Sequence, residues 1–456
     1  MAICEINEMA TREINVTGLI DGNKVSSAQV MIYIMCFLIM LLDGFDTQAV
    51  SYIAPALRED WHLVATQLSP VFGASVAGVV VGSFFIGPIA DRIGRRKVLL
   101  LSVFAFGLLS LISAWSSNLT ELTVLRFLTG LGLGGAIPNG ITIASEYSPR
   151  IKRGMIVAAI LSGFSVGSAL AGFTAAILIQ HTGWRSVLVV GGVLPLVLLP
   201  FMFLRMPESI RFLIETAGRT DKVGTIMRAI EPTTDFTGAT FTIDGQKQTG
   251  SPVSGLFKDK LARVTVVLWC GFFCSLLMMY LIISWLPLIL HSGGISLRAA
   301  AITGAMFQVG GIAGALVVGW LCDRFDPPKV IATTYFIAAL ATASIGYLTH
   351  DPIYACVAVT VAGFFIAGSH IGVNSFSPNL YPTNCRATGV SWLNSIGRFG
   401  SVLGSTIGGA ILALHLDMQH VFLLISLPAI GASLFIFILS AVRQKPPQSN
   451  NKLNRL

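Results

Sequence analysis

Two carboxylates inside one apolar segment are the residues of this 456-residue chain best suited to carrying a proton. Asp43 and Asp46, in the sequence LLDGFDTQA, are three positions apart and share one face if the segment is helical. Two carboxylates this close in a low-dielectric site cannot both ionise cheaply, so one should bind a proton readily. The pair is therefore a candidate proton-coupling site. The alternative is that one aspartate caps a helix break at Gly44 and faces water.

Four more ionisable residues lie in or beside apolar runs, where each is costly unless it is paired or hydrated. Arg398, in GVSWLNSIGRFG, has no acid near it in its own segment and requires an anion from another segment or from a substrate. Arg126 and Glu146 stand at the two ends of another run and are candidates for substrate binding and proton coupling; either could be a simple interfacial residue. His370 is a candidate proton relay, and the alternative is a hydrogen-bonded structural histidine.

The composition indicates that a membrane surrounds the segments that position these residues. The chain is 54% hydrophobic and only 11% charged, with a mean hydropathy of +0.76, whereas soluble domains are about a quarter charged. This excludes a cytosolic enzyme, a nucleic-acid-binding protein and a disulfide-stapled secreted domain. The seven cysteines show neither a disulfide framework nor a metal-binding spacing, so we predict no metal and no cofactor.

Long apolar runs predict an all-α membrane protein with twelve transmembrane helices. The predicted helices are near 30–54, 69–90, 98–117, 122–147, 154–180, 186–205, 264–290, 298–321, 330–349, 353–378, 387–414 and 420–441. Lys and Arg gather in alternate connections, which by the positive-inside rule puts both termini in the cytoplasm, so the net charge of +8 predicts no nucleic-acid partner. The predicted parts are a tail (1–29), a six-helix bundle (30–205), a cytoplasmic loop (206–263), a second six-helix bundle (264–441) and a tail (442–456).

The second group of helices repeats the first at an offset of 232 residues. The matching pairs are Pro55 and Pro287, Gly78 and Gly310, Gly82 and Gly314, Gly87 and Gly319, Asp91 and Asp323, Arg92 and Arg324, and Lys97 and Lys329. Two six-helix repeats in the same orientation are how rocking-bundle transporters are built. Neither a receptor nor a membrane-bound enzyme requires such a duplication, so the repeat favours transport.

The connection after the second predicted helix reads GPIADRIGRRK, from Gly87 to Lys97. It resembles the G-x-x-x-D-R-x-G-R-R motif of the major facilitator superfamily, and the resemblance covers essentially the whole chain. It implies a cytoplasmic latch that stabilises one conformation; the alternative is a plain topology anchor. A degenerate copy from Gly319 to Lys329 lacks the second glycine and the trailing basic run, which predicts a weaker latch. The predicted gating residues are Gly87, Asp91, Arg92, Gly94, Arg95, Arg96, Asp323, Arg324 and Arg386.

Two other glycine patterns have the spacing of enzyme motifs but not the context. Gly130, Gly132 and Gly135 satisfy G-x-G-x-x-G, and residues 163–167 satisfy G-x-S-x-G. Both lie inside long apolar runs, whereas a dinucleotide turn or a nucleophile elbow needs a preceding strand. We therefore predict that these glycines serve helix packing and that the protein is not an enzyme.

Within the superfamily, the segments DGFDTQA, YLIISWLPLIL, GVSWLNSIGRFG and YPTNCRATG resemble the aromatic acid:proton symporter family. The resemblance implies a bacterial inner-membrane importer of hydroxybenzoates, protocatechuate, gallate or related acids. Such a protein would work by alternating access in the lipid bilayer, with protons as co-substrate, and we expect a monomer. The resemblance implies functional charges at Arg126, Glu146, Arg386 and Arg398, and candidate ring-stacking walls at Tyr280, Trp285 and Trp392.

Three alternatives remain open at the level of sequence. The protein could carry another organic acid, such as a muconate- or shikimate-like compound, or it could be an exporter of drugs or metabolites. A transporter-like sensor is a third possibility, but such a protein is expected to have a sizeable soluble domain, and the longest predicted loop spans only residues 206–263.

Overall fold

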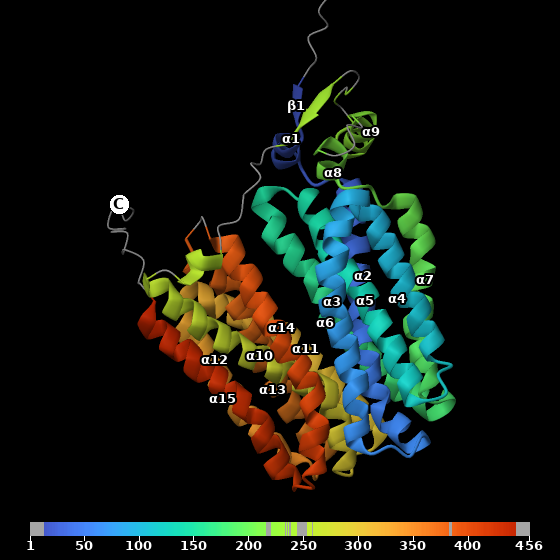
Figure 1. Cartoon of the computed structure of the whole chain (residues 1–456), viewed down its shortest axis with the longest axis vertical. Helices are drawn as coiled ribbons and strands as arrows, with labels where there is room; N and C mark the ends of the chain where they lie inside the picture. Colours follow the sequence, from blue (N-terminus) through green and yellow to red (C-terminus); the bar gives the residue numbers. More distant parts are fainter. Residues whose placement is uncertain are drawn as a thin grey trace, which may run out of the picture. The chain divides into compact units, whose positions relative to one another are not determined.

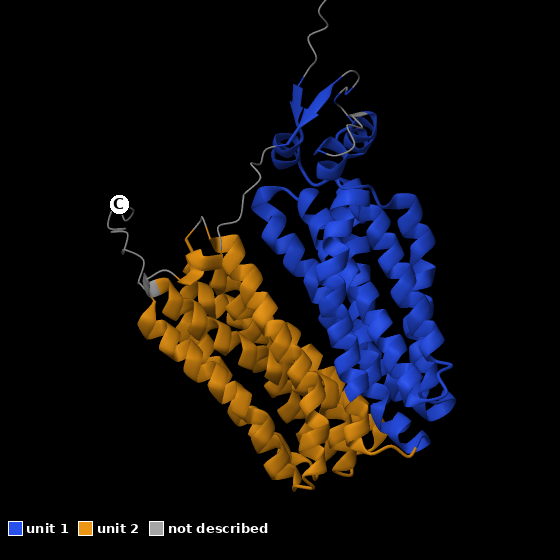
Figure 2. Cartoon of the chain, in the orientation of Figure 1, with its two compact units in different colours: residues 1–61, 70–248 blue, residues 62–69, 249–456 orange. Residues whose placement is uncertain are grey.

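A computed structural model describes residues 13–215, 220–232, 234, 236, 239–243, 253–257, 259–382 and 385–443. The chain divides into two compact units, coloured blue and orange in Figure 2. Unit 1 comprises Met1–Trp61 and Pro70–Gln248, and unit 2 comprises His62–Ser69 and Thr249–Leu456. The predicted tail 442–456 lies almost entirely outside the described residues.

Twelve helices in the described part of the chain are long and apolar enough to cross a membrane, which confirms the predicted architecture. In unit 1 they are α2 (Ser27–Asp60), α3 (Ala65–Ile93, from Pro70 on), α4 (Arg95–Ser113), α5 (Leu119–Glu146), α6 (Arg150–Thr182) and α7 (Arg185–Arg205) (Figure 1). In unit 2 they are α10 (Asp259–Ser292), α11 (Leu297–Arg324), α12 (Pro327–Leu348), α13 (Pro352–Phe376) continued by the 3-10 turn η2 (Ser377–Leu380), α14 (Arg386–Ala413) and α15 (Met418–Val442). Several helices run a few residues beyond the predicted ranges, because hydropathy marks where the apolar part ends and not where the helix ends.

Polar side chains cap the N-termini of several helices, at positions that hydropathy alone does not predict. Helix α2 begins with a capping box, in which the Ser26 hydroxyl accepts from the Gln29 backbone N–H and the Gln29 side chain accepts from the Ser26 N–H. Asn118 and Ser296 cap α5 and α11 by accepting from the backbone N–H three residues further on. These bonds satisfy donors that the helix itself leaves unpaired.

The sequence repeat corresponds to a repeated helix contact. A Cβ at Gly82 of α3 would collide with the Leu131 carbonyl oxygen of α5, and a Cβ at Gly314 of α11 would collide with the Phe364 carbonyl oxygen of α13. The second and fourth helices of each unit thus approach backbone to backbone at equivalent positions. Small residues at such contacts are the usual means of close helix packing in membranes.

The two glycine patterns with enzyme-like spacing are confirmed as packing features. Gly130 of α5 abuts the Ser75 carbonyl oxygen of α3, and Gly167 of α6 abuts the Leu41 carbonyl oxygen of α2. Both patterns lie well inside a continuous helix, so neither has the strand that the enzyme motifs require.

Short elements from the N-terminal tail and the central loop fold together at one end of unit 1 (Figure 1). They are β1 (Glu13–Asn15), α1 (Val16–Gly22), α8 (Ile210–Glu215), α9 (Thr220–Ile230) and β2 (Thr240–Thr242), while η1 (Val253–Phe257) belongs to unit 2. Strands β1 and β2 pair in parallel, with Ile14 opposite Phe241. Apolar residues of α1, α9 and β2 join the main core cluster of unit 1. The tail and the loop were predicted as separate connecting segments. They pack together because each has apolar side chains that are buried only when the two segments are in contact.

Candidate functional site

A fully buried ion pair joins Asp46 of α2 to Arg126 of α5. The Arg126 Nη1 donates to both carboxylate oxygens of Asp46 at 3.2 Å, and both side chains have no exposed surface. The hydroxyl of Ser110 also donates to the Asp46 carboxylate. The Arg126 Nη2 donates to Ser113 Oγ at 3.1 Å and Thr129 Oγ1 at 3.2 Å. Each charge therefore has an opposite charge and at least one neutral hydrogen-bond partner.

Three helices, α2, α4 and α5, supply the side chains of this site. Ser110 and Ser113 are one turn apart on α4, and Arg126 and Thr129 are one turn apart on α5, so each pair presents one polar face. Gly44 lets α2 lie directly against α6, because a Cβ there would collide with the Phe164 carbonyl oxygen. The three hydroxyls were not predicted as site residues. Their i, i+3 spacing beside a predicted intramembrane charge is the signal that could have found them.

The second predicted aspartate has different surroundings. Asp43 is buried on α2 and accepts a hydrogen bond from Thr47 Oγ1 at 3.3 Å. The negative charge of Asp46 is compensated by the Arg126 guanidinium. The sequence predicted two neighbouring carboxylates but not this counter-ion. Asp46 thus has Arg126 as its counter-ion and lies one helical turn from the buried Asp43.

Glu146 lies at the other end of α5 from this pair. Its carboxylate accepts from Arg95 Nη1 at 3.0 Å and from Ser209 Oγ at 2.6 Å, while Arg95 Nη2 pairs with Asp91 at 3.2 Å. Twenty helical residues separate Arg126 from Glu146, which is about 30 Å along the axis. The structure thus joins Glu146 to the predicted gating residues Asp91 and Arg95, and it does not bring Glu146 to Asp46.

A second set of contacts ties the start of α4 to the segment after α7. The Arg96 backbone N–H donates to Glu208 Oε1 at 2.8 Å, and the Arg96 guanidinium donates to the Phe203 carbonyl oxygen. Gly94, with a φ of 106°, makes room for Glu208, since a Cβ there would lie 2.5 Å from Oε2.

Tyr147, directly after α5, lies close to Glu146 and Glu208. Burial raises the pKa of Tyr147 well above its ordinary value, with a further contribution from the Glu146 and Glu208 carboxylates.

The remaining predicted gating residues lie apart from these contacts. Arg92 is exposed, and a Cβ built at Gly87 would meet no other element within 4 Å in the described residues. In unit 2, Asp323 is exposed and the Arg324 guanidinium lies over the Trp320 ring at 4.4 Å. Arg386 is exposed, with its Nε 3.4 Å from the Tyr381 carbonyl oxygen.

An ion pair of unit 2 that was not predicted involves the next acid along the chain. Asp326, at the N-terminal cap of α12, accepts from the Arg443 guanidinium at the end of α15, and this guanidinium also lies over the Phe376 ring. The sequence repeat predicted Asp323 as the gating acid, because Asp323 corresponds to Asp91 of the first motif. The acid that forms an ion pair lies three residues later.

A buried polar chain in unit 2 contains the predicted His370 of α13. Its Nδ1 lies 3.1 Å from Ser275 Oγ, which in turn lies 2.5 Å from the Tyr335 hydroxyl. Its Nε2 lies 3.1 Å from the Asn374 side-chain nitrogen, and the imidazole stacks on the Phe272 ring. Both ring nitrogens of His370 therefore face neutral polar groups.

Arg398 of α14 is half-buried, and its charge acts electrostatically on His370. Within the described residues, no carboxylate lies within ion-pair distance of Arg398, although an intramembrane guanidinium requires an anion. The binding of a substrate carboxylate by Arg398 stays a prediction.

The three predicted aromatic residues have distinct surroundings in unit 2. Trp285 is fully buried, and its indole N–H donates to the Ser405 carbonyl oxygen at 2.8 Å. Trp392 stacks on Trp269 with the ring centroids 5.9 Å apart. Tyr280 is partly buried against the unit 2 core. Trp285 thus has a packing role between α10 and α14, and the ring-stacking role of all three remains a prediction.

No cluster of three or more His, Cys, Asp or Glu side chains suited to a metal ion is present in the described residues. The polar groups at the sites above are carboxylates, guanidinium groups, hydroxyls and one imidazole, which can bind protons and anions.

Comparison with known proteins identifies the family. The sequence model of the Major Facilitator Superfamily matches residues 36–293 and 268–455, so the chain belongs to this superfamily of transporters. The solved structure of a D-xylose-proton symporter superimposes with a TM-score of 0.70 over 90% of this chain and 98% of that one, at 18% sequence identity, which supports the fold.

Two relatives of this chain carry names of aromatic-acid transporters. The gallate transporter of Pseudomonas putida is 43% identical over 425 residues, covering 93% of this chain and 94% of the relative. The 4-hydroxybenzoate transporter PcaK of Pseudomonas aeruginosa is 40% identical over 431 residues, covering 94% of this chain and 96% of the relative. The chain is thus a multi-pass membrane transporter and not an enzyme, and the predicted family resemblance is confirmed.

Proposed function

We propose that the protein is a proton-coupled symporter that imports an aromatic carboxylate of the hydroxybenzoate, protocatechuate or gallate class by alternating access. The site of action would be the bacterial inner membrane, with both termini in the cytoplasm. The observation that carries the proposal is the buried Asp46–Arg126 pair in a chain 38–43% identical to gallate and 4-hydroxybenzoate transporters. A carboxylate and a guanidinium that neutralise each other out of water are suited to exchanging a proton and an anion.

The proposed coupling follows from competition for one guanidinium. In the empty protein Arg126 binds Asp46; when Asp46 takes up a proton, its charge disappears and Arg126 loses its counter-ion. The carboxylate of the substrate then replaces Asp46 as the anion bound to Arg126. Ser113 and Thr129 hold the guanidinium in either state. Proton and substrate thus favour each other's binding, because either one alone leaves a buried charge without a partner.

Asp43 is the second proton-coupling residue in this proposal. It lies one helical turn before Asp46 on the same helix and is also buried, so α2 offers a second buried carboxylate as a proton acceptor. Glu146 and His370 are further candidates for proton transfer, although Glu146 lies about 30 Å along α5 from Arg126.

A candidate cation for substrate binding lies in unit 2. Arg398 is half-buried with no carboxylate partner in the described chain, which makes it available to a substrate carboxylate. The rings of Tyr280, Trp285 and Trp392 are the candidate apolar surfaces for the substrate ring. Of these, Trp392 is the most exposed, at 39%.

The decisive experiment is uptake into proteoliposomes with an acid-outside pH gradient. Labelled 4-hydroxybenzoate, protocatechuate and gallate are the substrates, and wild type is compared with Asp46→Asn. Asp417→Asn is the matched control, since that carboxylate is 89% exposed at the start of α15. Accumulation of at least one acid that is lost in Asp46→Asn and retained in Asp417→Asn is the expected result.

Other results would redirect the proposal. Absence of uptake of all three acids would reject the substrate class while leaving the family assignment intact. Proton-driven uptake that Asp46→Asn matches would move the coupling to Asp43, Glu146 or His370. Net efflux under the same gradient would favour an exporter.

A further inference from the structure

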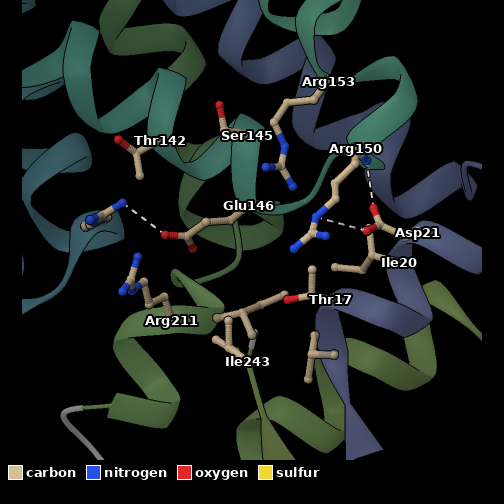
Figure 3. Close-up of a pocket in the computed structure, with 13 residues that line it drawn as sticks. Thr17, Ile20, Asp21, Thr142, Ser145, Glu146, Arg150, Arg153, Arg211 and Ile243 are labelled. Atoms are coloured by element: carbon tan, nitrogen blue, oxygen red, sulfur yellow. Dashed lines mark hydrogen bonds and ion pairs between the residues drawn. The ribbon is translucent and has the colours of Figure 1, made fainter. Parts of the chain in front are cut away.

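A cavity of about 260 Å³ lies at the end of unit 1 that carries the N-terminal and central-loop elements (Figure 3). Its lining comes from α1, α8 and Ile243 after β2, together with the near ends of α4, α5 and α6. Pockets for drug-sized ligands are about 300–1,000 Å³, so this cavity suits a smaller, single-ring compound. It is separate from the Asp46–Arg126 pair, because Glu146 in its lining is about 30 Å from Arg126 along α5.

The lining has more positive than negative charge. It contains the arginines 95, 150, 153 and 211 and the acids Asp21 and Glu146. Both acids are already paired, Glu146 with Arg95 at 3.0 Å and Asp21 with Arg150 at 3.4 Å. Arg211 pairs with Glu215 outside the cavity, at 2.8 Å. Among the described residues, this leaves Arg153 as the lining cation with no carboxylate partner.

Arg153 is held in position without being neutralised. One of its terminal nitrogens donates to the Ser148 carbonyl oxygen at 3.2 Å, and its Nε is buried with no hydrogen-bond partner in the described chain. Figure 3 shows its guanidinium pointing into the cavity from α6. Because Arg150 is already paired with Asp21, Arg153 supplies the uncompensated positive charge in this space. The polar side of the cavity is therefore suited to a carboxylate.

The lining also includes apolar side chains. Val16, Ile20, Ile210 and Ile243 contribute side chains from α1, α8 and the residue after β2, and Thr17 adds a methyl and a hydroxyl group. An inorganic anion would leave this surface without a partner. A flat ring attached to a carboxylate would cover it while the charge reaches the arginines.

We propose that this cavity is a second binding site for a small aromatic carboxylate, distinct from the transport site, with Arg153 as the main partner of the carboxylate. The identity of the ligand rests on the proposed function, because the acid that is carried is the ring carboxylate most available to this protein. In the predicted topology the cavity faces the cytoplasm, so its occupancy reports the imported acid. The Arg95–Glu146 pair of the latch forms one wall, which puts the ligand in direct contact with a predicted gating residue.

Binding to purified full-length protein tests the proposal by equilibrium dialysis with labelled 4-hydroxybenzoate. Arg153→Gln removes the free cation, and Thr17→Phe fills the cavity without changing the charge. Lys222→Gln is the matched control, because Lys222 is an exposed cation on α9 outside the cavity. We expect two bound molecules per wild-type and Lys222→Gln protein, and one per Arg153→Gln or Thr17→Phe protein, with the thermal unfolding midpoint of each variant as the check on folding.

The outcomes separate this inference from the proposed function. Equal binding by wild type and both folded cavity variants overturns the second site, even if proteoliposomes accumulate the acid. Binding that both cavity variants reduce supports the second site, even if no uptake occurs and the transport proposal fails. Arg153-dependent binding of inorganic phosphate without binding of 4-hydroxybenzoate would overturn the aromatic ligand class.

Discussion

At the scale of single residues, Asp46 and Arg126 neutralise each other where neither side chain is exposed. A buried pair of this kind adds little net stability, because desolvation offsets the attraction, but the loss of one partner leaves a buried charge uncompensated. Its neighbours Ser110, Ser113 and Thr129 are neutral, so the charges in contact within this cluster are those of Asp46 and Arg126.

Arg126→Gln should therefore lower the free energy of unfolding by about 3–5 kcal/mol, because Asp46 stays buried without its counter-ion. The double variant Asp46→Asn/Arg126→Gln should recover most of this loss, since both charges are absent. Thermal or chemical unfolding of the purified protein measures the two effects. A double variant as unstable as Arg126→Gln alone would show that packing of the arginine, and not its pairing, is what matters.

At the scale of helices, glycines decide how closely neighbours approach. Gly82 lies against the Leu131 carbonyl oxygen, and its counterpart Gly314 lies against the Phe364 carbonyl oxygen. Any side chain at either position must push two helices apart, and the resulting shift would propagate along α3 or α11. The repeat in the sequence is thus a repeat of backbone contacts.

Gly82→Ala should cost about 1–3 kcal/mol of stability, the usual range for overpacking. Gly154→Ala on α6 is the matched control, because a Cβ there meets no atom within 4 Å and alanine favours the helix. The melting temperature of purified Gly82→Ala should therefore fall, whereas that of Gly154→Ala should stay the same or rise. A similar fall in both would contradict the close contact between α3 and α5.

The predicted latch also belongs to the scale of helices, since its ion pairs join the ends of α3, α4 and α5. Asp91 pairs with Arg95, which pairs with Glu146, whereas Asp323 of the second motif is exposed and has no ion pair in the described chain. We expect Asp91→Asn to reduce the initial rate of uptake in proteoliposomes severalfold and Asp323→Asn to change it little. Equal reductions in both variants would show that the two motifs contribute alike.

At the scale of the whole molecule, the proposed transport cycle carries one monoanion with one proton. Such a cycle is electroneutral and draws on the pH gradient alone, at about 1.4 kcal/mol per pH unit. A second proton would add the membrane voltage, at about 2.3 kcal/mol per charge for 100 mV. Substrate accumulation at a fixed pH gradient should therefore not change when a potassium diffusion potential is imposed. Accumulation that rises with an inside-negative potential would require a second proton.

The sequence by itself determined the twelve helices, the two repeats, the superfamily and the presence of intramembrane charges at Asp43, Asp46 and Arg398. These features are local or periodic, because hydropathy, charge placement and motif spacing depend on residues that are close together in the sequence or recur at a fixed interval. The named relatives and the family match agree with this level of prediction.

Only the tertiary structure decided which charges meet. Asp46 and Arg126 are 80 residues apart, and Glu146 joins Arg95 and not Asp46, because helix packing and not sequence spacing sets these contacts. The cavity under α1 likewise requires the tail and the central loop to fold against α5 and α6. A charged residue in a transmembrane segment indicates from the sequence alone that it needs a partner. The packing of the helices determines which residue that partner is.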